Sequence, residues 1–197
     1  MVKTDNEAKV LSFLARWFKE SYSINQLAKK IGLTPKGMHK LLKRLEQQGL
    51  IAPRKMANAI FYHINFDSDL ACKAVELALF EEIKLPYARV QAKDIERLRP
   101  VVIATVLFGS VLERGEKADD IDLLVIFEKS KYRSFQKELD MLQALKTKRI
   151  HAVMQTPEDL ISNLQKPDGV LLEILKTGRI LWGHHVIVDA IKQAVKK

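Results

Sequence analysis

An apolar run that ends in a glycine-serine pair and is followed by two closely spaced aspartates most constrains the fold of this chain. The run covers residues 101–108 and ends at Gly109-Ser110. Nine residues separate Ser110 from Asp120-Ile121-Asp122, which leads into a second apolar run over residues 123–127. Short apolar runs of this kind are typical of buried strands. The pattern therefore predicts two strands, the first ending in a turn of small residues and the second carrying two carboxylates.

The spacing of the two aspartates indicates a metal site. Residues i and i+2 share one face of a strand, so Asp120 and Asp122 point the same way while Ile121 points into the core. Two like charges this close repel each other unless a cation lies between them, and Mg²⁺ suits such oxygen ligands. The backbone N–H groups and hydroxyl of Gly109-Ser110 suit a phosphate. The alternative is an ordinary turn followed by a solvated acidic cluster.

The segment LFGSVLERGEKADDIDLLVIF is similar to the signature of the polymerase-beta-type nucleotidyltransferase superfamily, especially its minimal members. The chain end LLEILKTGRILWGHH is similar to the closing helix and strand of these domains, and the resemblance covers about residues 90–190. It implies that Gly109 and Ser110 bind the phosphates of a nucleoside triphosphate, expected to be ATP. It also implies that Asp120 and Asp122 hold Mg²⁺ or Mn²⁺, with Arg114 as a further phosphate contact.

One departure from that superfamily concerns the third carboxylate, which active members carry on a later strand. The matching strand is predicted over residues 149–155 and contains no acid. By alternation, His151 stands where the carboxylate belongs. A neutral imidazole can act as a general base, so His151 joins Asp120 and Asp122 as a candidate catalytic residue. It contributes no negative charge to a metal site, which leaves turnover open.

The first third of the chain predicts a helix-turn-helix. Helical periodicity indicates three helices, over residues 6–19, 24–31 and 35–48. Ser23 and Thr34-Pro35 suit helix N-termini, and Gly32 suits the turn between the second and third helices. Two short strands follow, over residues 50–52 and 60–64, separated by a basic loop over residues 53–58. A hairpin in this place would make the motif winged.

Charge is concentrated in the same part of the chain. Residues 1–66 hold 12 of the 33 Lys and Arg residues but only 4 of the 24 Asp and Glu residues, a balance of +8 within the net +9. Such asymmetry suggests a polyanionic partner. A helix fits the major groove, and cations of the third helix and hairpin suit its phosphates. The candidate DNA-binding residues are Lys36, His39, Lys40, Lys43, Arg44, Arg54 and Lys55.

The segment INQLAKKIGLTPKGMHKLLKRLEQQGLI resembles winged-helix regulators of the MarR and ArsR kind. The resemblance covers about residues 6–66 and implies binding to double-stranded DNA, commonly as a homodimer. Winged helices also serve as protein-interaction modules, which is the alternative for this domain.

The fold class expected is α+β, with an N-terminal winged helix-turn-helix and a C-terminal α/β nucleotidyltransferase-like domain that has a small mixed sheet. The domains expected are residues 1–66, a connecting helix and linker over 67–90, and residues 91–197. Within the linker a helix is predicted over 67–83 and a break at 85–87. The remaining predicted helices cover 91–99, 132–145, 157–165, 169–176 and 186–195, with a strand at 179–183.

Several classes of protein are excluded by composition. No apolar run approaches the roughly 18 residues needed to span a bilayer, so no membrane association is expected. The start of the chain lacks the apolar segment of a signal peptide. The single cysteine, Cys72, excludes an internal disulfide and a multi-cysteine zinc site and suits a buried thiol. We therefore expect a cytoplasmic protein.

The function expected from the sequence is that of a DNA-binding transcriptional regulator whose C-terminal domain binds a magnesium-bound nucleotide. Transfer of a nucleoside monophosphate by that domain stays open. One alternative is an active nucleotidyltransferase that modifies a partner and uses the winged helix to choose it. The resemblance to minimal members makes an antitoxin with a HEPN-type protein partner a concrete variant. Another alternative is a degenerate domain that senses nucleotide or holds a dimer.

Overall fold

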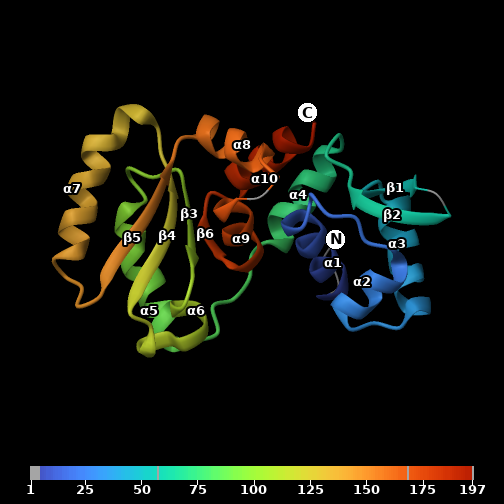
Figure 1. Ribbon diagram of the computed structural model, residues 1–197, viewed down its shortest axis with the longest axis horizontal. Coiled ribbons are helices and arrows are strands. Elements are labelled where there is room, and N and C mark those ends of the chain that lie inside the picture. The colour runs from blue at the N-terminus through green and yellow to red at the C-terminus, as the bar shows by residue number, and fades with distance from the viewer. Residues whose placement is uncertain (1–4, 57, 168, 197) are drawn as a thin grey trace. The chain divides into compact units, whose positions relative to one another are not determined.

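The computed structural model describes residues 5–56, 58–167 and 169–196. Contacts divide the chain into two compact units, the first ending at Leu79 and the second beginning at Phe80. The two units are visible in Figure 1 and are described separately below. No helix among the described residues is long and apolar enough to cross a membrane.

The first unit consists of helices followed by a hairpin and a further helix. Its elements are α1 (Asp5–Arg16), α2 (Ile24–Ile31), α3 (Pro35–Gln47), β1 (Ile51–Met56), β2 (Ala59–Ile64) and α4 (Asp69–Ala78). The apolar faces of the helices enclose a core that includes Leu11, Leu27, Met38, Leu42 and Leu45, all fully buried. The three predicted helices and the hairpin are thereby confirmed, and no helix end differs from its predicted position by more than three residues.

Local chemistry explains the turn between α2 and α3. The hydroxyl of Ser23 caps α2 in a reciprocal capping box with Gln26. Gly32 closes α2 in the left-handed region at φ 79°, where glycine has no steric cost. The hydroxyl of Thr34 then accepts a hydrogen bond from the backbone N–H of Gly37 at 3.1 Å, and Pro35 occupies the first turn of α3. The caps predicted at Ser23 and Thr34 are confirmed.

The predicted bounds of two segments in this part of the chain were wrong. The loop expected over 53–58 is largely strand, because β1 continues to Met56 with Pro53 opposite Tyr62. A sheet of two strands has only edges, so the missing N–H of proline is tolerated there. The helix expected over 67–83 ends at Ala78. Beyond it, Phe80 stacks on the imidazole of His184 with ring centroids 3.6 Å apart, a tertiary contact that periodicity cannot show.

The second unit is built around a four-stranded sheet in the order β5-β4-β3-β6. Its strands are β3 (Ala104–Phe108), β4 (Asp120–Ile126), β5 (Arg149–Gln155) and β6 (Arg179–Trp182). Its α-helices are α5 (Pro86–Ile95), α6 (Val111–Arg114), α7 (Tyr132–Gln143), α8 (Pro157–Gln165), α9 (Val170–Thr177) and α10 (His184–Val195), with short 3-10 turns at Glu96–Leu98, Gly115–Lys117 and Lys129–Lys131. β4 runs parallel to β5, whereas β3 is antiparallel to β4 and β6. The small mixed sheet expected from the sequence is confirmed.

Helices cover both faces of this sheet (Figure 1). On one face, Ile121, Leu123 and Val125 of β4 share a core with residues of α5 and α7. On the other face, α9 and α10 contact β3 and α8 contacts β5. Leu124 and Ile126 are fully buried on this second face, but Asp120 and Asp122, which share it by alternation, stay partly exposed. The second face of β4 is therefore covered along its C-terminal half and open at its beginning.

The ends of several elements in the second unit differ from expectation. Pro86 does not break the chain but begins α5, because proline suits the first turn of a helix. β3 begins at Ala104 rather than residue 101, and α10 begins at His184. The strand over 149–155 and the helix over 157–165 are confirmed. Trp182 packs in the core, where its indole N–H donates to the carbonyl of Val102 at 3.0 Å. In the first unit, Cys72 is buried, as expected.

Candidate functional site

Strand pairing assembles the candidate site from three neighbouring strands. Asp122 lies opposite Phe108 of β3 on one side and His151 of β5 on the other. Asp120 lies opposite Arg149 of β5. Because residues opposite each other in a sheet share a face, the two carboxylates, the imidazole and the guanidinium belong to one face at one end of the sheet.

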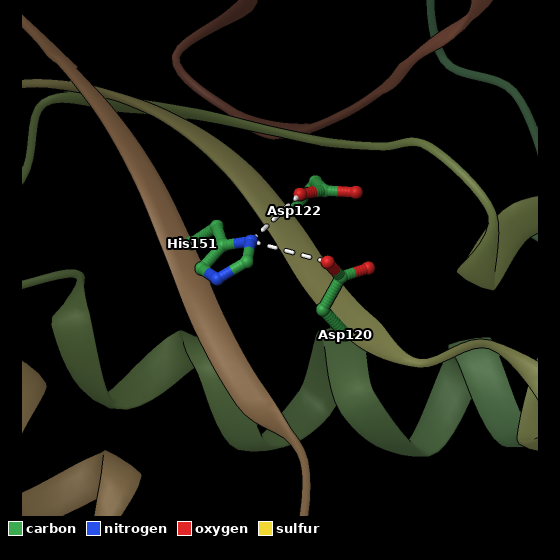
Figure 2. Close-up of side chains that lie close together, drawn as sticks. All are labelled: Asp120, Asp122 and His151. Atoms are coloured by element: carbon green, nitrogen blue, oxygen red, sulfur yellow. Dashed lines mark ion pairs between the residues drawn. The ribbon is translucent and has the colours of Figure 1, made fainter.

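Figure 2 shows the two carboxylates and His151 converging on a common point. The Nδ1 atom of His151 lies 3.1 Å from Oδ2 of Asp120 and 3.7 Å from Oδ1 of Asp122. One ligand atom from each residue fits within 4.8 Å of the others. The Asp120 side chain is 31 % exposed and that of Asp122 23 %, so a cation and its ligands can approach from solvent.

Gly109 allows the carboxylate of Asp122 to approach the turn after β3. Its φ of 77° lies in the left-handed region, and a Cβ placed on it would be 2.3 Å from Oδ2 of Asp122. The next residue, Ser110, has a buried hydroxyl oxygen without a hydrogen-bond partner among the described residues. The positive φ and the close approach of the Asp122 carboxylate both favour glycine here, and an unused hydroxyl stands beside it.

Arg114, the third residue assigned to phosphate contacts, lies apart from this cluster. It ends α6, and its Nη2 atom is 3.5 Å from Oδ2 of Asp119. In the described part of the chain, the structure brings Arg114 into contact with neither carboxylate of β4. The structure thus joins Gly109, Asp120, Asp122 and His151 in one cluster but leaves Arg114 outside it.

Two cations near the site were missed from the sequence. Arg149 shares the face of the carboxylates, which only the parallel register of β4 and β5 reveals. Lys148 donates from its Nζ atom to the backbone carbonyls of Glu116 and Ala118, immediately before the two aspartates. The same ammonium lies 5.1 Å from the ring centroid of Tyr87. Lys148 thereby anchors the segment that leads into β4.

The candidate DNA-binding cations of the first unit lie on α3 and β1. Lys36, His39, Lys40 and Lys43 are exposed along α3, and Arg54 and Lys55 are exposed on β1 rather than in a loop. Lys43 pairs within α3, where its Nζ atom lies 3.4 Å from Oε2 of Glu46, whereas the Nε atom of Arg44 lies 2.8 Å from Oε1 of Glu7 on α1. Glu7 is only 3 % exposed, so this pair ties α3 to α1. Arg44 therefore has a structural partner within the unit.

Comparison with known families agrees with both parts of the structure. Residues 4–52 match the family of winged helix-turn-helix DNA-binding domains. Residues 91–185 match the polymerase beta nucleotidyltransferase family. The chain joins a winged helix-turn-helix domain to a polymerase-beta-type nucleotidyltransferase domain. No curated protein sequence matches the chain.

In the nucleotidyltransferase domain, the surroundings of Asp122 disfavour the negative charge of its carboxylate. Burial raises the pKa of its carboxyl above the usual 3.8, and the neighbouring charge of Asp120 raises it further, while His151 partly offsets both effects. The folded domain therefore disfavours the ionised form of Asp122. A divalent cation beside the two carboxylates would relieve this penalty.

In the winged-helix domain, histidine adds no charge to the hairpin at neutral pH. Burial lowers the pKa of His63 below the usual 6.5, and the positive charge of Arg54 lowers it further. The positive potential of the hairpin therefore rests on Arg54 and Lys55.

We expect Asp122→Asn to raise the unfolding temperature of the metal-free protein at pH 7. A carboxyl whose pKa is raised by folding lowers stability at every pH above its folded pKa, and this penalty disappears as the pH falls to its unfolded value of 3.8. Thermal unfolding in EDTA from pH 3.5 to 8 should show a gain at pH 7 that vanishes at the acid end. Asp119→Asn, which changes an exposed neighbour, should show no such gain; equal profiles for the two variants would contradict the assignment.

We expect Arg44→Ala to destabilise the winged-helix domain by about 1–2 kcal/mol. Removing the guanidinium takes a charged partner from the buried carboxylate of Glu7, although the half-exposed Arg44 side chain limits the loss. Lys40→Ala, on the same helix, should change the free energy of unfolding by less than about 0.5 kcal/mol. Urea denaturation followed by circular dichroism measures both, and similar losses would exclude the structural role of Arg44.

Proposed function

We propose that this protein is a DNA-binding transcriptional regulator whose nucleotidyltransferase domain binds a nucleoside triphosphate, ATP, together with a divalent metal ion. The observation that most directly supports nucleotide binding is the close approach of the Asp122 carboxylate to Gly109. A Cβ at residue 109 would collide with the carboxylate, and the unused hydroxyl of Ser110 lies next to it. A carboxylate pair beside a small-residue turn suits a metal and the phosphates that the metal bridges.

The charges at the site support the proposal that the nucleotide binds together with the metal ion. Asp120 and Asp122 together carry two negative charges, so a bare triphosphate would be repelled from this end of the sheet. A divalent cation between carboxylates and phosphates reverses that interaction. Arg149, on the same face, adds a further positive charge toward a phosphate. We therefore propose that nucleotide affinity depends on the metal.

The DNA-binding half of the proposal is supported by the winged-helix family match and by the exposed lysines of α3. Lys36, His39 and Lys40 lie in the N-terminal half of α3, the part of a recognition helix that approaches base edges. Lys43, Arg54 and Lys55 suit backbone phosphates. Arg44 is given a smaller part in DNA binding because of its pair with Glu7.

A second candidate function is transfer of a nucleoside monophosphate to a hydroxyl. In that reaction the hydroxyl oxygen bonds to the α-phosphorus, pyrophosphate leaves, and a base takes the hydroxyl proton. His151, close to Asp120, is the observation that favours it. Within the described residues, however, the cluster of candidate ligands contains only two carboxylates. This shortage of negative charge is why binding, rather than transfer, is proposed first.

DNA affinity should depend on the exposed lysines of α3. We expect the double variant Lys36→Glu, Lys40→Glu to bind duplex DNA at least about 100-fold more weakly at 100 mM salt. The slope of log affinity against log salt should fall by about 2, since two phosphate contacts are lost. Fluorescence anisotropy over a salt series measures both quantities. The matched variant Lys129→Glu, Lys131→Glu changes two exposed lysines of the other domain and should keep the affinity; full retention by the α3 variant would refute the regulator proposal.

Nucleotide affinity should depend on the absence of a side chain at residue 109. Gly109→Ala is expected to weaken binding of ATP with Mg²⁺ or Mn²⁺ by about 10–100-fold, as for loss of a group that orients a metal ligand. Gly49→Ala is the matched control, because Gly49 has a similar φ of 69° but nothing within 4 Å of an added Cβ. Both variants carry a backbone strain of about 1 kcal/mol. Calorimetric titration measures the affinity of each variant for metal-bound ATP, which should be lower for Gly109→Ala than for Gly49→Ala.

Equal affinities of the two glycine variants for metal-bound ATP would contradict the proposal that the metal binds beside Gly109. The same samples, incubated with α-labelled ATP, distinguish the two candidate functions. Nucleotide binding without covalent label favours the binding role. Label that becomes attached to protein, nucleic acid or a small acceptor, and that is lost in Asp122→Ala, would favour the transferase.

A further inference from the structure

His151 lies where it could coordinate the same metal ion as Asp120 and Asp122. It belongs to β5, and the parallel register with β4 sets it directly opposite Asp122. Its side chain turns its Nδ1 atom toward both carboxylates, as Figure 2 shows. This contact joins two neighbouring strands of one sheet.

One of the two distances from His151 matches the separation of two ligands on a single ion, and the other is slightly longer. Two atoms that each lie about 2.1 Å from one metal are about 3.0 Å apart when they subtend a right angle and about 3.4 Å apart at a tetrahedral angle. The Nδ1 atom of His151 is 3.1 Å from Asp120 and 3.7 Å from Asp122. Small side-chain rotations would bring all three within the first coordination sphere of one ion.

We propose that His151 is the third protein ligand of the metal site, and that the site therefore prefers a first-row transition ion to Mg²⁺. Mg²⁺ demands oxygen ligands in near-ideal octahedral geometry. Imidazole nitrogen suits first-row transition ions such as Fe²⁺, Ni²⁺, Cu²⁺ and Zn²⁺. Affinities for mixed nitrogen and oxygen sites rise from Mn²⁺ to Cu²⁺ and fall again at Zn²⁺. An aspartate or glutamate at residue 151 would favour Mg²⁺ instead.

Charge supports the same assignment. Two carboxylates and a neutral imidazole balance one divalent ion, whereas three carboxylates would leave a net negative charge. A neutral centre with Arg149 on the same face accepts polyanionic phosphates with less repulsion. The inference deepens the proposed function by naming its metal class, but the metal site itself does not depend on nucleotide binding.

The test is the direct detection of imidazole nitrogen on the metal in the full-length protein. Protein stripped with EDTA is loaded with one equivalent of Mn²⁺, without nucleotide, and examined by pulsed electron paramagnetic resonance. We expect modulation from a directly coordinated ¹⁴N nucleus in the natural protein and in His185→Gln, which changes an exposed histidine of the same domain. His151→Gln should lose the ¹⁴N modulation and bind Mn²⁺ about 10–100-fold more weakly.

A second variant keeps the proposal testable if His151→Gln perturbs folding. His151→Asp should also lose the ¹⁴N modulation but still bind Mn²⁺, and its Mn²⁺-over-Mg²⁺ preference, measured by Mg²⁺ competition, should fall by at least about 10-fold. Bound Mn²⁺ without ¹⁴N modulation, an unchanged preference in His151→Asp, or no Mn²⁺ binding would overturn the inference. Failure of ATP to bind while the ¹⁴N signal persists would instead overturn only the proposed nucleotide function.

Discussion

The approach of a carboxylate to a bare Cα atom is the constraint on which the candidate site depends. Asp122 can lie against the end of β3 only because residue 109 has no side chain and adopts a positive φ. The pairing of β3 with β4 brings the two together, and the pairing of β4 with β5 adds His151. Backbone hydrogen bonds between three strands thus bring Gly109, Asp120, Asp122 and His151 together at one end of the sheet.

Much of this arrangement could be predicted because it follows from local patterns. The strand over 149–155 and the helix over 157–165 follow from apolar alternation and from the Thr156-Pro157 start of a helix. The shared face of Asp120 and Asp122 follows from the period of a strand. The position of His151 was expected from that period together with the resemblance to the nucleotidyltransferase superfamily. The caps at Ser23 and Thr34 follow from hydroxyl chemistry at helix N-termini.

What could not be predicted depends on pairing between distant segments. The place of Arg149 beside the carboxylates requires the register of β4 and β5, which no local pattern contains. The contacts of Lys148 with the segment before β4, and of Arg44 with Glu7, likewise join residues 30 or more positions apart. The same holds for the stacking of Phe80 on His184, two residues far apart in the sequence.

Arg44 shows that a cation on an exposed helix can be engaged by a contact inside the protein. Its helix presents a row of exposed cations, but the guanidinium of Arg44 reaches back to a carboxylate that is almost fully buried on α1. A buried carboxylate is costly unless it is paired, so the domain holds this cation for its own stability. Arg44 therefore links α3 to α1, while Lys36 and Lys40 of the same helix stay exposed. A basic residue in a recognition helix is thus assigned to DNA only after its contacts inside the protein are known.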